Sequence, residues 1–137
     1  MGTTKKLSMP LAAATPFELI AVSTMLSPSR LLLLLQRDLG WTLMRHAEAE
    51  RVLGRLVFAD ETTLRPGVIA LIANKMDGGS LLVPQLPTVD YLLELTGFMP
   101  GDVAAKALTA LQNAPDVQAA IRVQPSTIKR STPFWPV

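Results

Sequence analysis

The 137-residue sequence predicts an all-α fold, a small bundle of five or six helices around one long helix at about 28–57, with extended arms at both ends. Three observations predict this class. Thr15-Pro16 and Ser27-Pro28 each place a capping residue before a proline, which is typical of a helix start. Between residues 28 and 57, apolar residues also recur at three- and four-residue steps, as they do on one face of a helix.

The first helix is predicted at about 16–26, because Thr15 and Glu18 form a capping box. Gly40 and Gly54 are the weak points of the long helix that follows, since glycine lowers helix stability. The expected inner face of this long helix consists of Leu32, Leu35, Leu39, Leu43, His46, Glu50, Leu53 and Val57.

Two interpretations of the stretch 67–76 stay open. Its Ala, Leu and Met residues favour a helix that ends at Gly78-Gly79, and the alternative is a short β-hairpin at 68–83. Further short helices are expected at 89–96, 101–112 and 115–122. The chain then divides into an N-terminal arm (1–14), a helical body (15–87), a three-helix unit packed on the body (88–123) and a C-terminal arm (124–137).

The composition indicates a surface that faces a partner. Hydrophobic residues make up 49% of the chain and charged residues 18%, against roughly 25% charged in typical soluble domains. One small domain cannot easily bury so much apolar side chain, so we expect part of it to contact another protein. The sequence contains no cysteine, which excludes disulfides and thiolate metal sites.

Basic residues gather towards the two ends. Residues 1–14 and 121–137 hold five of the 13 basic residues and none of the 11 acidic ones, which suits docking to an acidic protein surface or a phosphate backbone. Prolines interrupt the first apolar patch, so no secretory signal is expected, and no apolar run is long enough to span a membrane. We expect a place in the cytoplasm or in an assembled particle; mitochondrial targeting stays open, because no acid precedes Glu18.

The four residues Asn74-Lys75-Met76-Asp77 match the guanine-reading signature of GTPases. A GTPase also needs a glycine-rich phosphate loop that ends in Gly-Lys, and the sequence contains no Gly-Lys pair. We therefore interpret the motif as a polar helix end or turn before Gly78-Gly79.

His46 is the single histidine, and Glu50 follows it one helical turn later. This pair suits either proton transfer or a structural hydrogen bond, and we favour the structural interpretation. The sequence offers no further histidine or cysteine as a metal ligand and no Gly-x-Ser-x-Gly elbow. It therefore predicts a non-enzymatic protein with no catalytic residue, cofactor, metal ion or small-molecule substrate.

The C-terminal stretch IKRSTPFWPV combines two cations with two aromatic residues and flanking prolines. Tryptophan buries much area at interfaces, and proline reduces the entropy that an arm loses on docking. Lys129, Arg130, Phe134 and Trp135 are therefore predicted to bind a partner.

Residues 88–123 contain Gly97-Phe98, Ala107-Leu108, and Val117 with Ala120. With these features the segment resembles the three-helix ubiquitin-associated (UBA) fold and its relative at the N-terminus of elongation factor Ts. The resemblance implies a three-helix unit that contacts a protein partner through the turn at Gly97, Phe98 and Met99 and through the third helix.

The function that we expect is a non-enzymatic structural or interaction subunit of a larger assembly, such as a virion, with protein partners in a homo- or hetero-oligomer. One alternative is a small adaptor that binds a partner protein through its UBA-like unit. The other is a nucleic-acid-associated protein that uses its basic arms.

Overall fold

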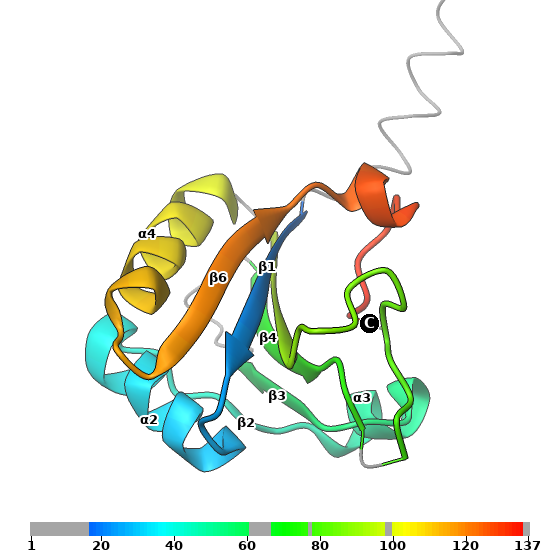
Figure 1. Ribbon diagram of the computed structural model, residues 1–137, viewed down its shortest axis with the longest axis horizontal. Helices are drawn as coiled ribbons and strands as arrows, with labels where there is room; N and C mark the ends of the chain where they lie inside the picture. The colour runs from blue at the N-terminus through cyan, green and yellow to red at the C-terminus, as the bar shows by residue number, and fades with distance from the viewer. Residues whose placement is uncertain (1–16, 61–66, 77, 98–99, 136–137) are drawn as a thin grey trace, which may run out of the picture.

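The computed structural model describes residues 17–60, 67–76, 78–97 and 100–135. It contradicts the all-α prediction, because the described residues form a mixed α/β fold around a six-stranded antiparallel sheet in the order β2-β3-β4-β5-β1-β6 (Figure 1). The strands are β1 (Phe17–Thr24), β2 (Met44–Arg45), β3 (Val57–Asp60), β4 (Gly67–Ala73), β5 (Tyr91–Gly97) and β6 (Val117–Val123). The helices are α2 (Pro28–Leu39), α3 (Ala47–Leu53), α4 (Pro100–Asn113) and the short 3-10 helix η1 (Pro125–Ile128).

The helix predicted at 16–26 is wrong, because these residues form strand β1. β1 lies between β5 and β6, and both of its faces are covered. Ile20 and Val22 pack on one side of the sheet, whereas Leu19 and Ala21 pack on the other. A strand that is buried on both faces shows a continuous apolar run without alternation, so its period does not distinguish it from a buried helix.

The long helix predicted at 28–57 is also wrong, because two glycines end it early. The predicted start is confirmed: the Ser27 side chain caps α2 by accepting a hydrogen bond from the N–H of Arg30. Gly40 then takes a left-handed φ of 72° and ends α2, and Gly54, with φ 70°, ends α3. Because this conformation is strained for other residues, each glycine redirects the chain, and β2 and β3 follow α2 and α3 respectively.

The C-terminal half also departs from the helical prediction. Residues 67–73 form strand β4, which pairs with β3 and β5, and an isolated antiparallel bridge joins Lys75 to Leu81. The helix expected at 101–112 is confirmed as α4, but those expected at 89–96 and 115–122 are strands β5 and β6. The span 88–123 is therefore a strand–helix–strand unit in place of the expected three helices.

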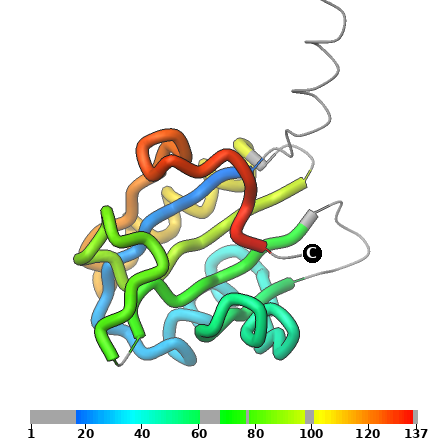
Figure 2. The backbone as a smooth tube through the Cα atoms, turned by 90° about the vertical axis from the view of Figure 1, so that its right-hand side faces the viewer, coloured from blue at the N-terminus to red at the C-terminus, as the bar shows by residue number. Residues whose placement is uncertain are grey.

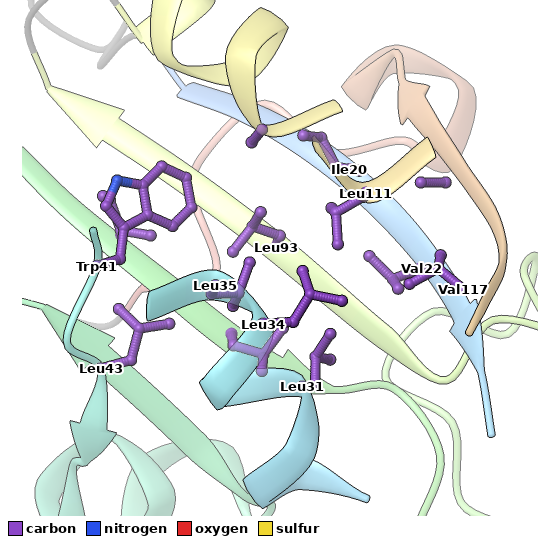
Figure 3. Close-up of a cluster of buried hydrophobic side chains, with 14 of the residues drawn as sticks. Ile20, Val22, Leu31, Leu34, Leu35, Trp41, Leu43, Leu93, Leu111 and Val117 are labelled. Atoms are coloured by element: carbon purple, nitrogen blue, oxygen red, sulfur yellow. The ribbon is translucent and has the colours of Figure 1, made fainter. Parts of the chain in front are cut away.

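Different elements cover the two faces of the sheet. Helices α2 and α4 pack on one face, where Leu31, Leu35 and Leu111 meet Ile20 and Leu93 of the sheet (Figure 3). The opposite face carries α3, the connection 74–90 and the end of the chain (Figure 2).

The extended C-terminal arm predicted at 124–137 is wrong for the residues that the structure describes. Residues 125–135, here called the strap, fold back over the sheet, and Ile128, Phe134 and Trp135 join the buried cluster of that face. The N-terminal arm predicted at 1–14 lies outside the described residues.

Candidate functional site

The turn between β1 and α2 brings apolar side chains to the surface. Thr24 shapes this turn: its hydroxyl donates to the carbonyl of Asp116 at 2.7 Å and accepts from the N–H of Leu26 at 3.1 Å. Met25 follows with 85% of its surface exposed, and Leu33, five residues after the start of α2, is 64% exposed. Large apolar side chains that stay this exposed are candidates for contact with a partner.

Two depressions meet at this turn. The larger has a volume of about 530 Å³ and is lined by Thr24, Met25, Leu26, Pro28, Leu56, Ala73, Lys75, Met76, Asp90 and Tyr91. The smaller has a volume of about 290 Å³ and is lined by Leu26, Arg30, Leu33, Leu34, Arg37 and Asp116. Since Leu26 lines both, they lie next to each other, and we call the region that they form the corner surface.

Polar and charged side chains also line the corner surface. Asp90 uses one carboxylate oxygen to accept from the N–H of Thr24 at 2.9 Å, and its other oxygen lies 3.6 Å from Lys75 Nζ. Burial, with the nearby charge of Asp90, raises the pKa of the Tyr91 hydroxyl, so this group stays neutral at pH 7. Arg30, by contrast, forms no ion pair within the part of the chain that the structure describes.

Asn74, from the motif that resembles a GTPase signature, organises the connection that borders this site. Its side chain is fully buried and donates to the carbonyls of Leu86 and Val89 at 2.9 and 2.8 Å. Its amide oxygen accepts from the N–H of Val83 at 2.9 Å. Asn74 therefore holds the 74–90 connection in place and presents no free group to a base, while Asp77 lies outside the described residues.

His46 and Glu50 have separate structural roles. His46 caps α3, because its Nδ1 accepts from the N–H of Ala49 at 3.1 Å, and its ring lies edge-on to Trp135 at 4.8 Å between centroids. Glu50 pairs with Arg45 at 2.6 Å, and this hydrogen-bonded contact lowers the pKa of Glu50. Within the described residues, no group of three or more His, Asp or Glu side chains could hold a metal ion.

The four site residues predicted at the C-terminus all belong to the strap. Lys129 is exposed and has a left-handed φ of 55°. The Arg130 guanidinium donates to the carbonyls of Thr132 and Pro133 and lies 4.1 Å from the centre of the Phe134 ring. Phe134 and Trp135 are only 7% and 8% exposed, because they pack on the chain's own sheet.

Glu94, in the middle of β5, fastens the strap to the sheet. Its carboxylate is fully buried and accepts from the N–H groups of Phe134 at 2.6 Å and Trp135 at 2.8 Å. Burial raises the pKa of Glu94, although these two hydrogen bonds and the charge of Arg130 act in the opposite direction. Of the other predicted site residues, Gly97 ends β5, and Phe98 and Met99 lie outside the described residues.

No protein family, curated protein or solved structure that was compared with the chain matches it. Among the described residues, no helix has the length and apolar character needed to cross a membrane.

Sequence reasoning missed the corner surface. Met25 lies inside the predicted first helix and Leu33 inside the apolar first turns of the long one, so neither stands out from its neighbours in the sequence. The signal in the sequence was that the first turns of the predicted long helix are apolar almost all round, which suits either the centre of the fold or an interface.

Proposed function

We propose that this protein is a non-enzymatic interaction subunit of a larger protein assembly and that it docks through the corner surface. The observation that carries the proposal is the exposure of Met25 and Leu33 beside two adjoining depressions. Methionine adapts its shape to apolar partners, and burying one large apolar side chain contributes about 1.5–3 kcal/mol.

The charges of the surface favour a particular partner chemistry. Arg30 lines the smaller depression without an ion-pair partner among the described residues, whereas Lys75, at the larger one, is already paired with Asp90. A partner segment that offers apolar side chains to Met25 and Leu33 and a carboxylate to Arg30 would satisfy both features. The occupant we propose is therefore an acidic, amphipathic segment of another protein.

Affinity purification from the native source tests this proposal. We expect tagged wild-type protein to retain a defined set of partner proteins at fixed stoichiometry, and Met25→Asp to lose them, because the substitution places a charge where apolar contact is needed. Met44→Asp is the matched control, since Met44 is also an exposed methionine (69%) but lies on β2, away from the depressions.

A second variant tests the charge. Arg30→Glu should reduce recovery of the same partners and should make the remaining binding less sensitive to salt. If Met25→Asp and Arg30→Glu both recover the wild-type set of partners in the wild-type amounts, the corner surface is not the docking site.

A further inference from the structure

Strand β6 ends the sheet and, within the described residues, pairs with β1 alone. It runs for seven residues, VQAAIRV, without a glycine or proline, but its register with β1 shifts at Ser23/Thr24, where Gln118 is the extra residue of a β-bulge. Natural proteins usually protect an edge with a short strand, a proline, a lysine or a bulge of this kind. The bulge lies near one end of β6 and leaves residues 119–123 in regular register, whereas the opposite edge is protected by its shortness, because β2 is only two residues long. The two edges of this sheet are therefore unequal.

The exposed side chains of β6 are the apolar Ala119 and Ile121 and the polar Gln118 and Arg122. Ala120 packs beneath the helices, so its neighbours Ala119 and Ile121 face the other side, where both are exposed and Ile121 is 54% exposed. The one charged residue of the strand, Arg122, pairs with Glu18 of β1 at 2.5 Å. A strand with compensated charge and exposed apolar side chains is suited to pairing with another strand.

We propose that β6 joins two copies of this chain, with the two β6 strands pairing in antiparallel orientation to make one continuous sheet. The regular part of the strand is complementary to itself: a two-fold axis at Ala120 sets Ala119 opposite Ile121 of the second copy and brings Arg122 opposite the bulge at its Gln118. Every cation then faces a neutral side chain, so no like charges meet across the junction. The side-chain amide of Gln112 donates to the Ala120 carbonyl at 3.0 Å, and a main-chain N–H of the second copy can replace it.

This second copy binds at a surface separate from the corner surface, so the two proposals can fail independently. None of the residues that line the two depressions belongs to β6. Met25→Asp should therefore leave self-association unchanged.

Light scattering and sedimentation across a dilution series test the proposal with the full chain. We expect wild-type protein to reach twice the 14.8 kDa mass of one chain. Ile121→Lys should raise the dimer dissociation constant by about tenfold or more, because each dimer carries the substitution twice on the pairing edge. Val52→Lys is the matched control: Val52 is also 54% exposed but lies on α3, so this variant should dimerise like wild type.

Cross-linking tests the geometry, because the chain has no cysteine of its own. A short thiol cross-linker should join two copies of Ala119→Cys and should not join two copies of Val52→Cys. Circular dichroism establishes that each variant is folded. The proposal would be overturned by a wild-type chain that stays monomeric throughout the dilution series. It would also be overturned by a dimer whose dissociation constant Ile121→Lys and Val52→Lys change equally. A monomer that binds an extended segment of another protein at β6 would contradict it too.

Discussion

Glu94 shows how one residue can decide the course of a whole segment. A carboxylate buried in the middle of a sheet is costly unless its oxygens are hydrogen-bonded. Here both oxygens bind main-chain N–H groups of the strap, at Phe134 and Trp135. Since the bonds go to the backbone, Glu94 sets the path of the strap, and the aromatic side chains fill the space beneath it.

The pKa of Glu94 leads to a prediction about stability and pH. Burial raises this pKa above its ordinary value of 4.5. The folded state then holds a proton that the unfolded state has released, so the free energy of unfolding should fall as the pH rises from 4.5 through the folded pKa. Urea unfolding at a series of pH values measures this fall.

The variant Glu94→Gln should remove that fall, because glutamine does not titrate. The same variant should loosen the strap, since an amide has one oxygen for two N–H donors, and hydrogen exchange at Phe134 and Trp135 should become faster. Glu48→Gln, an exposed change on α3, is the control and should keep the wild-type profile. A fall that persists in Glu94→Gln would show that another group causes it.

Among the structural elements, the connection 74–90 depends most on one side chain. Asn74→Ala removes three side-chain hydrogen bonds, two buried and one partly buried, and leaves the carbonyls of Leu86 and Val89 and the N–H of Val83 without that partner. We expect a loss of about 3 kcal/mol in the free energy of unfolding, measured with urea. Asn113→Ala, at the exposed end of α4, should change it by less than about 0.5 kcal/mol, and equal losses would contradict this role of Asn74.

Local signals in the sequence predicted element ends better than element types. The Ser27 cap and α4 follow from short-range chemistry, and the predictions of both are confirmed. The strands β1, β5 and β6 were predicted as helices because their apolar runs are buried by sheet neighbours that lie far away in sequence. Propensity gives way to such tertiary contacts.

Across the whole molecule, one set of strands carries both apolar clusters. Ile69 and Leu71 of β4 face the helices, whereas Ala70 and Ile72 face the strap. Neither side can lose its packing without disturbing strands that support the other side. We therefore expect a single cooperative unfolding transition.

The two buried tryptophans can test this expectation, because Trp41 lies on the helix side and Trp135 on the strap side. Trp41→Phe and Trp135→Phe leave one fluorescent reporter each. In urea, the remaining tryptophan and circular dichroism should give the same midpoint within each variant. A tryptophan signal that changes well before the circular dichroism signal would show that one side unfolds separately.

The candidate site could be predicted from the sequence only in part. Excess apolar character indicated a partner-facing surface, but which side chains remain exposed depends on how the sheet and helices pack. Trp135 stood out as an interface anchor on its chemistry alone, and the structure places it against His46 and the chain's own sheet. The chemistry of its side chain identified Trp135 as a residue that buries surface area. Only the fold shows which residues it packs against.

The position of β1 has a consequence for how the chain is made. This strand is synthesised before its two neighbours in the sheet, because β5 and β6 follow it at a distance in the sequence. Until residues 91–123 emerge, the apolar side chains of β1 have no strand to pair with, and such long-range pairing is slow. The nascent chain therefore carries an unpaired apolar strand while the residues between β1 and β5 are synthesised, and such a segment is suited to transient cover by a chaperone.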